Sequence, residues 1–233
     1  MKEYLFEMHA HNAEVSRCAK AFAQELAERY IALGYDGIVS TNHLNSHTFS
    51  SPEFKNASWE AKAEKFMSGF RAVEKAVNGR LTVLLGAEVS LYSEPNDYLV
   101  YGVTEEFLKN NGDIMSLTKE ELSALVHENG MLIVQAHPFR RDMLIADWEI
   151  LDGYEVFNGN PRHESSNEIA MHWAKLHGKS LMTSGSDFHE SGDEGTGGMY
   201  FETDIASNAE LLDALKNGRY RLKGVCFSAP FCG

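Results

Sequence analysis

The sequence predicts an α/β barrel built as a single domain over residues 1–233. Two observations support it: short apolar runs alternate with segments of helical spacing, and His, Glu or Asp repeatedly follows an apolar run. Such alternation is typical of parallel strands joined by helices. In a barrel the carboxyl ends of the strands meet at one rim, so these polar side chains are expected to converge there. A length of 233 residues suits one such barrel.

The predicted elements follow one another without an internal repeat or a long linker. Strands are expected at 4–8, 37–40, 81–85, 98–103, 131–135, 153–157, 180–183 and 200–203, and helices at 19–33, 59–77, 118–129, 163–177 and 209–217. Thr118 and Glu121 mark the clearest helix start, because Ser or Thr followed three residues later by Glu can form a capping box. A serine-rich loop at 45–57 and a glycine-rich loop at 192–198 are expected at the rim.

The composition excludes several classes of protein. A net charge of −13 argues against a protein that coats nucleic acid, although it permits a small anionic substrate. No apolar run approaches the roughly 20 residues that span a bilayer, and the N-terminus is too short and acidic for a signal peptide. The cysteines, Cys18, Cys226 and Cys232, form no CxxC pair and are odd in number, which does not indicate a disulfide framework. We therefore expect a cytoplasmic protein without a membrane partner.

The strongest motif is His9-Ala10-His11, which follows the first apolar run. Residues two apart on a strand point to the same side, so both imidazoles can bind one ion. The same arrangement recurs at Asp187-Phe188-His189. Strand histidines can also simply satisfy backbone groups, and recurrence of the motif is what favours metal binding.

Further candidate ligands lie near the ends of other predicted strands. The complete set is His9, His11, Glu14, His43, Glu88, His137, Asp187 and His189. Imidazole with carboxylate suits zinc, manganese or iron. The set is too large for one ion and indicates two or three. Glu88 ends an apolar run, where an unpaired carboxylate would be costly to bury, which favours a metal ligand there. As alternatives to metal binding, His43 could be a loop histidine and Glu14 an exposed acid near a helix start.

Two arginines are candidates for binding a substrate phosphate. Arg162 lies in a loop just past a predicted strand, and its guanidinium could bind phosphate bidentately. Arg140 follows His137-Pro138-Phe139. For both, a surface arginine without such a role is an equal alternative. Cys18 lies near the first motif, but no Gly-x-Ser-x-Gly, Walker or GxGxxG motif supports nucleophilic or nucleotide-dependent chemistry.

Taken together, five motifs resemble those of the PHP superfamily, named for phosphoesterase domains of bacterial polymerases and for histidinol phosphatases. They are His9-Ala10-His11, Thr41-Asn42-His43, Gly86-Ala87-Glu88, His137-Pro138 and 185–189, in the order of the family. The resemblance implies a distorted (β/α)7 TIM-like barrel with a trinuclear metal cleft. It also implies that His9, His11, Glu88 and Asp187 hold one ion, that Glu88 bridges to a second ion at His137, and that His43 and His189 hold a third.

Two positions depart from the family pattern. The acid that usually follows the first motif is missing at Ser16-Arg17-Cys18, and we expect Glu14 to replace it. Asp97 stands where the family often has a histidine, and we expect it to bind the second ion. If neither replacement holds, two ions remain.

The resulting hypothesis is metal-dependent hydrolysis of a small phosphomonoester, with Arg162 or Arg140 orienting the phosphate and His189 or Asp187 relaying a proton. Extended nucleic acid is not expected, because the chain has no basic stripe. One alternative is a phosphodiesterase or 3′→5′ exonuclease on short oligonucleotides. Another is a non-catalytic, metal-stabilised binding module. The sequence does not indicate an oligomeric state.

Overall fold

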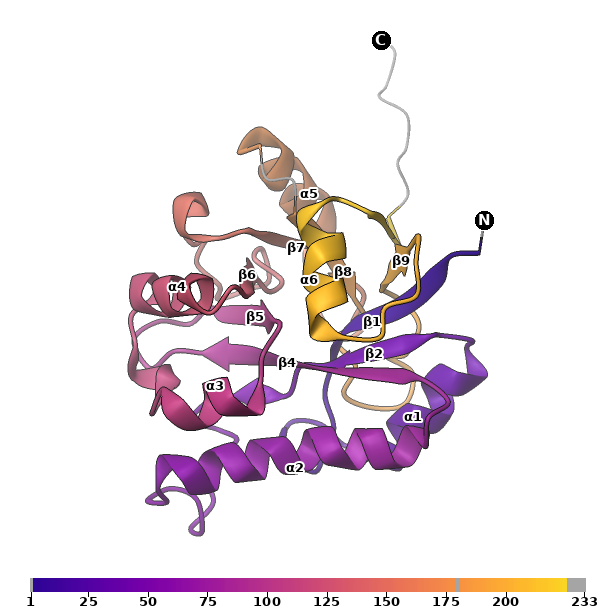
Figure 1. The fold of residues 1–233 in the computed structure, drawn as a ribbon. Helices are drawn as coiled ribbons and strands as arrows, with labels where there is room; N and C mark the ends of the chain where they lie inside the picture. Colours follow the sequence, from indigo (N-terminus) through magenta and orange to yellow (C-terminus); the bar gives the residue numbers. More distant parts are fainter. Residues whose placement is uncertain (1, 179–180, 226–233) are drawn as a thin grey trace.

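Seven neighbouring strands curl into a nearly closed barrel in the computed structural model of the chain, which describes residues 2–178 and 181–225 (Figure 1). In order around the barrel they are β1 (Tyr4–Ala10), β2 (Gly37–Ser40), β4 (Thr82–Ser90), β5 (Asp97–Tyr101), β6 (Leu132–Gln135), β7 (Gly153–Asn158) and β8 (Leu181–Gly185). A bridge between Ala10 and Phe188 brings the two ends together. Here the Phe188 N–H donates to the His9 carbonyl at 3.1 Å.

One strand of the barrel runs against its neighbours. β5 is antiparallel to both β4 and β6, whereas β1, β2 and β4 are mutually parallel, as are β6, β7 and β8. The connection at 91–96 contains no helix, and a connection this short can join only antiparallel strands. The predicted α/β barrel is confirmed. It departs from strict strand–helix alternation at β5 and also between β6 and β7, where the connection contains only a 3-10 turn.

Three short strands extend the sheet. β9 (Met199–Phe201) pairs antiparallel with β1, and β10 (Tyr220–Leu222) pairs with β9. β3 (His43–Leu44) pairs with β4 beyond the end of β2, in a register that sets His43 opposite Glu88. This register places two of the expected ligands side by side.

The helices cover the outside of the barrel. They are α1 (Ala23–Ala32), α2 (Trp59–Val77), α3 (Glu105–Asn110), α4 (Lys119–Glu128), α5 (Asn167–Leu176) and α6 (Asn208–Lys216), with short 3-10 turns at Ile114–Ser116 and Trp148–Ile150. In Figure 1, α2 runs below β2 and β4, and α5 lies at the upper side. The capping box predicted at Thr118 and Glu121 is present, and Ser58 and Ser207 cap α2 and α6.

Several element boundaries differ from the prediction. The predicted helix at 163–177 begins only at Asn167, since the preceding Ser166 has a left-handed backbone (φ 48°). The helix predicted at 19–33 begins at Ala23. Residue 180, the expected start of a strand, lies outside the described residues, as do Cys226 and Cys232.

The main hydrophobic core joins the strands of the barrel to the helices around it. Its largest fully buried members include Phe6, Met8, Tyr98, Tyr101 and Tyr154. β1 is buried along five consecutive residues from Phe6 to Ala10, as expected for a strand covered on both faces. Within the described residues, no helix combines the length and the hydropathy needed to cross a membrane.

Candidate metal centre

The carboxylate of Glu88 lies at the centre of the site. It projects from β4, is fully buried, and has four imidazoles around it. One carboxylate oxygen lies 3.2 Å from His9 Nε2 and 3.1 Å from His137 Nε2. The other lies 3.3 Å from His11 Nε2 and 2.9 Å from His43 Nδ1. Imidazoles from three separate parts of the chain therefore meet at one acid.

Asp187 forms a second acidic position beside Glu88. Its Oδ1 lies 3.5 Å from His9 Nε2, 3.4 Å from His11 Nε2 and 3.3 Å from His189 Nδ1. The Asp187 backbone is left-handed, with φ 53°, and that of His137 has φ 27°. Non-glycine residues seldom adopt this conformation, which costs about 1–3 kcal/mol and is concentrated at functional sites.

The potential ligand atoms form four overlapping groups. Within each group, the atoms that could bind an ion lie within 4.8 Å of one another. The groups are His9–His11–Glu88, His9–His137–Asp187, Glu88–Asp97–His137 and His11–His43–His189. The structure thus brings together seven of the eight ligands proposed from residue pattern, and Asp97 with them. Their overlap suits a cluster of ions better than one ion.

The residues present fit divalent cations. In the described part of the chain, the buried atoms without a hydrogen-bond partner include His9 Nε2, His11 Nε2, His43 Nδ1 and Glu88 Oε2. These atoms lie close to one another but not in hydrogen-bonding geometry. Buried polar groups of native proteins nearly always have partners, and imidazole nitrogen with carboxylate oxygen is a donor set that suits transition-metal ions.

The imidazoles and carboxylates of the centre shift one another's pKa values in different directions. Burial opposes charge on the His9 ring, but three nearby carboxylates outweigh it and raise its pKa well above the usual 6.5. The pKa of His43 is raised in the same way, mainly by Glu88. Burial and two neighbouring imidazoles instead lower the pKa of His11 well below 6.5. For Glu88 and Asp187, burial would raise the pKa, but His9 and the other imidazoles around them together outweigh burial and lower both pKa values well below their usual values.

Two buried acids that belong to none of the ligand groups form hydrogen bonds with residues of the cluster. Glu155 on β7 lies with Oε1 2.9 Å from His9 Nδ1, and its Oε2 accepts hydrogen bonds from the His137 N–H and from Asn158. Glu7 on β1 accepts the N–H groups of His9 and Ser186. Neither acid was among the residues proposed from sequence. Their signal in the sequence is an acid inside or at the end of an apolar run, as at Glu88.

Glu14 does not join the metal-binding groups. Both of its carboxylate oxygens lie 3.0–3.1 Å from the N–H of Ala23. This is the first residue of α1, whose N-cap residue Phe22 provides no side-chain hydrogen bond. The expectation that Glu14 replaces the missing family acid is thus not supported, because its carboxylate satisfies a helix end instead. Asp97, by contrast, lies with Oδ2 3.9 Å from His137 Nε2.

The two candidate arginines occupy different settings. Arg140 is largely buried, and its Nη2 donates to Asp187 Oδ2 and to Asn158 Oδ1, both at 2.8 Å. Arg162 instead pairs bidentately with Asp193, at 3.1 and 2.8 Å. Asp193 also accepts the N–H of His189. Arg140 therefore contacts a candidate metal ligand directly, whereas the guanidinium of Arg162 is paired with Asp193.

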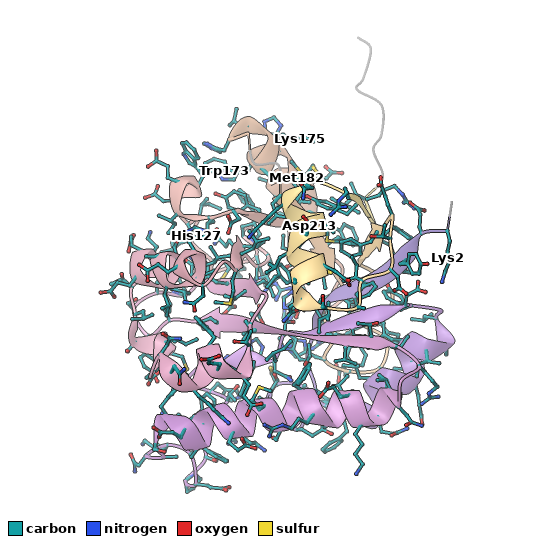
Figure 2. The ribbon with its side chains drawn as sticks, in the orientation of Figure 1. Lys2, His127, Trp173, Lys175, Met182 and Asp213 are labelled. Carbon is teal, nitrogen blue, oxygen red and sulfur yellow. The ribbon has the colours of Figure 1, made fainter. Side chains whose placement is uncertain are left out.

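The loop that carries Arg140 packs against α5. Phe139, its immediate neighbour, contacts Trp173 with ring centroids 6.1 Å apart. Trp173 is labelled on α5 in Figure 2, at the upper side of the molecule. This aromatic contact gives the Arg140 loop a fixed support.

Cys18 lies beside the outer histidines of the cluster. The residue is exposed. Partial desolvation would raise the pKa of its thiol, but the neighbouring imidazoles of His189 and His43 outweigh this effect and lower the pKa to about 6. In the sequence, the only signal at this residue is that it follows the first motif.

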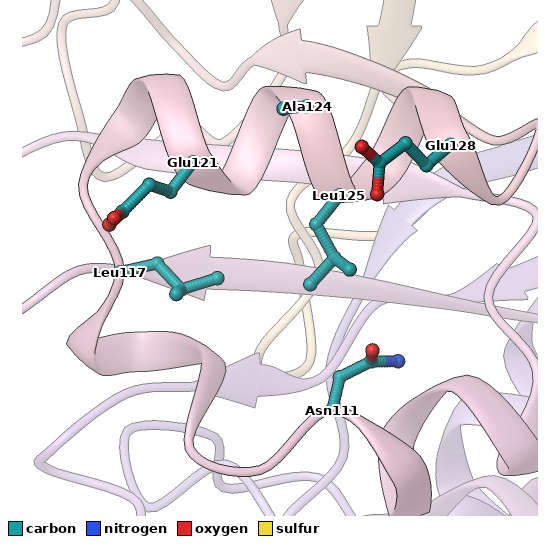
Figure 3. Close-up of a pocket in the computed structure, with 6 residues that line it drawn as sticks. All are labelled: Asn111, Leu117, Glu121, Ala124, Leu125 and Glu128. Carbon is teal, nitrogen blue, oxygen red and sulfur yellow. The ribbon is translucent and has the colours of Figure 1, made fainter.

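A separate pocket of about 360 Å³ lies at α4, away from these residues (Figure 3). It is lined by Asn111, Leu117, Glu121, Ala124, Leu125 and Glu128. Glu121 belongs to the capping box of α4. The pocket contains none of the grouped ligands and has no part in the metal centre.

Comparison with known proteins gives one family match and several similar structures. Residues 164–220 match a family described as PHP-associated. No curated protein matches the sequence. A candidate metal-dependent phosphoesterase of Bifidobacterium adolescentis superposes with a TM-score of 0.53 at 16% identity, over 95% of this chain and 97% of the other.

Two further structures have higher TM-scores. PsfC from Pseudomonas syringae gives 0.66 at 16% identity, over 91% of this chain and 88% of PsfC. The lesion-specific endonuclease PfuEndoQ from Pyrococcus furiosus gives 0.64 at 17% identity, over 95% of this chain but 58% of the endonuclease. At these identities the likeness establishes a shared fold. With the match over residues 164–220, it confirms the resemblance of this chain to the PHP superfamily that its motifs predict.

Proposed function

We propose that this chain is a metal-dependent phosphoesterase that hydrolyses a small phosphomonoester. The observation that carries the proposal is the Glu88 carboxylate, buried among four imidazoles with Asp187 beside them. Several carboxylates and imidazoles in overlapping groups suit closely spaced divalent ions, an arrangement common in phosphoryl hydrolysis. The similar structures described as a phosphoesterase and an endonuclease support the same reaction class.

The proposed centre holds two or three ions of zinc, manganese or iron. We assign them to His9, His11, His43, Glu88, Asp97, His137, Asp187 and His189, and leave out Glu14. When bound, such ions lower the pKa of a coordinated water and stabilise the negative charge that develops on the leaving oxygen. A single structural ion closes its coordination with four ligands. The larger ligand set therefore argues against a non-catalytic module.

The side chains around the ions would position the substrate and move protons. Arg140 reaches Asp187 and has a buried Nε without a hydrogen-bond partner among the described residues, so its guanidinium can donate to a phosphate oxygen. We assign the phosphate to Arg140 rather than to Arg162, which is held by Asp193. His189 and Asp187, which lie 3.3 Å apart, would pass a proton to the leaving group.

A second candidate is cleavage of short oligonucleotides as a phosphodiesterase or 3′→5′ exonuclease. The similar fold of PfuEndoQ favours it. A net charge of −13 weighs against long nucleic acids, which bind through many phosphate contacts. A monoester with one phosphate requires only a local cation such as Arg140.

The test is an assay of metal-reconstituted protein on p-nitrophenyl phosphate, bis(p-nitrophenyl) phosphate and a labelled oligonucleotide. We expect the monoester to be cleaved fastest, with activity lost on chelation and in H9A and D187N. His127, an exposed histidine paired with Asp152, provides the control variant H127A, which should keep full activity. Full activity of H9A and D187N, or of the chelated protein, would refute the proposal, and preference for the oligonucleotide would favour the second candidate.

A further inference from the structure

The side chain of Asn158 lies between the metal-binding groups and the candidate phosphate-binding arginine. Asn158 is the last residue of β7 and is 3% exposed. Its Nδ2 donates to Glu155 Oε2 at 2.9 Å and to Asp187 Oδ2 at 3.2 Å. Its Oδ1 accepts hydrogen bonds from Arg140 Nη2 at 2.8 Å and from the Asn160 N–H at 3.2 Å. Both donor hydrogens and both acceptor positions of this amide are therefore in use.

These partners determine which way the amide of Asn158 faces. Its nitrogen points at two carboxylates, and its oxygen points at a guanidinium. A flipped amide would turn its oxygen toward the carboxylates and its N–H groups toward the guanidinium, so that all three contacts would become repulsive. A carboxylate at this position could not donate to the two acids, and an apolar side chain would leave buried charged groups without partners. A neutral side chain that both donates and accepts therefore suits this position.

The backbone of Asn158 is held by α5. Asn167, the first residue of that helix, accepts the Asn158 N–H at 2.9 Å and donates to the Asn158 carbonyl at 3.0 Å. Within β7, the register shifts between Glu155 and Phe157. Side chains three apart on a regular strand face opposite sides, and one extra residue brings them to the same side. This irregularity explains how the Glu155 carboxylate and the Asn158 amide can meet.

We propose that Asn158 is a positioning residue that holds the guanidinium of Arg140 against Asp187 and thereby aligns the substrate phosphate with the metal ions. The inference rests on the proposed function and adds a residue that connects phosphate binding to metal binding. Arg140 Nη2 donates to Asn158 and to Asp187, both at 2.8 Å. Arg140 Nε is buried and has no hydrogen-bond partner in the described part of the chain. One nitrogen therefore anchors the guanidinium, and Nε stays available for a phosphate oxygen.

The same amide also orients a metal ligand. Asp187 Oδ2 is held by Asn158 and Arg140, whereas Asp187 Oδ1 lies 3.5 Å from His9 Nε2 and 3.4 Å from His11 Nε2. One oxygen of the carboxylate is thus fixed by hydrogen bonds, and the other faces the imidazoles. Loss of the amide should therefore weaken phosphate binding through Arg140 and metal binding through Asp187.

The experiment measures two affinities by calorimetry: that of the manganese-loaded protein for inorganic phosphate, and that of the metal-free protein for manganese. N158A should bind phosphate about tenfold less tightly than wild type, as expected when a hydrogen bond to a charged group is lost. It should bind manganese at least about tenfold less tightly, as on loss of other residues that orient metal ligands. R140A/N158A should bind phosphate no more weakly than R140A, because Asn158 acts on phosphate through Arg140. A general structural defect would instead add to the loss in R140A.

The matched control is N208A. Asn208 is a partly buried amide whose Nδ2 donates to the carbonyls of Leu85 and Val103 at 3.1 and 2.9 Å, and neither residue belongs to the ligand groups. N208A should bind phosphate and manganese as wild type does. N167A keeps the Asn158 amide but frees its backbone, so it tests the same role if N158A does not fold. It should weaken phosphate binding in the wild-type background and not in the R140A background.

The inference is overturned if folded N158A keeps the wild-type affinity for phosphate or for manganese, or if its loss of phosphate affinity adds to that of R140A. The same two phosphate results in N167A overturn it if N158A does not fold. These outcomes are separate from failure of the proposed function, in which the wild-type protein binds no ions and cleaves no ester.

Discussion

His9 Nδ1 lies 2.9 Å from Glu155 Oε1, with both side chains buried, while the opposite nitrogen of the same ring faces Glu88 at 3.2 Å. A carboxylate behind a metal-binding histidine fixes the ring and its tautomer, so that the other nitrogen is free to bind. Glu155 also accepts the backbone N–H of His137. One acid therefore orients ligands from two separate segments, β1 and the loop that follows β6.

Removal of this acid should weaken metal binding without removing a ligand. We expect E155A to lower metal affinity by about 10–100-fold and to reduce activity at limiting metal, with partial recovery at high metal. E155Q should lose less, because its amide oxygen can still accept one hydrogen bond. Metal titration followed by elemental analysis measures the effect. Unchanged affinity in E155A, with the fold intact by circular dichroism, would contradict this role.

Arg140 and Arg141 provide a matched pair of neighbouring arginines. Arg140 donates to Asp187, whereas the Arg141 side chain is 93% exposed and faces Asp142. A hydrogen bond to a charged group is worth about 1.5–3 kcal/mol, so R140A should lower kcat/KM by about 10–100-fold. R141A should change it less than about twofold, as is usual for exposed substitutions. Equal effects of the two substitutions would exclude a specific role for Arg140.

Much of the centre follows from local sequence pattern. His9, His11, Glu88 and Asp187 could be proposed because strand periodicity and the rim of a barrel constrain where such residues lie. His137 follows from the same rule, although its left-handed backbone could not be foreseen. The barrel itself followed from the alternation of apolar runs and helical segments.

Contacts between distant segments of the chain could not be predicted from the sequence. The distance between Glu155 and His9 is set by the packing of β7 near β1, which no local pattern encodes. The contact of Glu14 with the start of α1 is local, but the sequence does not distinguish such a helix-end carboxylate from a metal ligand. The reversal of β5 follows from the short connection at 91–96, which contains no helix.

Gly185 allows β8 to approach β1 closely. A Cβ at this position would lie 2.4 Å from the Cβ of His9 and 3.1 Å from Glu155 Oε1. G185A should displace His9, destabilise the protein by about 1–3 kcal/mol as overpacking does, and lower metal content. Chemical denaturation and elemental analysis measure the two effects.

The control for this substitution is G112A. A Cβ at Gly112 would have no atom of a neighbouring residue within 4 Å, and the backbone there has a φ of +65°. Alanine at this position should therefore cost only about 1–2 kcal/mol of backbone strain. Its metal content should stay at the wild-type level. A normal metal content in G185A would show that close approach at Gly185 does not position His9.

The histidines of the centre make the stability of the metal-free protein depend on pH. The pKa values of His9, His43 and His189 are raised in the folded chain despite burial. Nearby carboxylates are the chief cause for His9 and His43, and Cys18 and Asp187 are the causes for His189. A raised pKa adds stability that is complete below the unfolded value, 6.5, and is lost as the pH rises through the folded value. The lowered pKa of His11 reduces the stability of the folded chain only below pH 6.5, because there the unfolded chain binds a proton at this histidine that the folded chain does not bind.

In chelator, the melting temperature should therefore fall as the pH rises from about 6.5 to about 8.5. The lowered pKa values of Glu88 and Asp187 do not alter this trend, because their stabilisation is complete above the usual carboxyl range. With zinc present the trend should reverse, since ions displace protons from the imidazoles and bind more tightly at higher pH. Thermal scans with and without zinc at each pH measure both trends. A melting temperature that rises with pH in chelator would mean that the buried histidines are neutral and that the carboxylates do not hold protons on them.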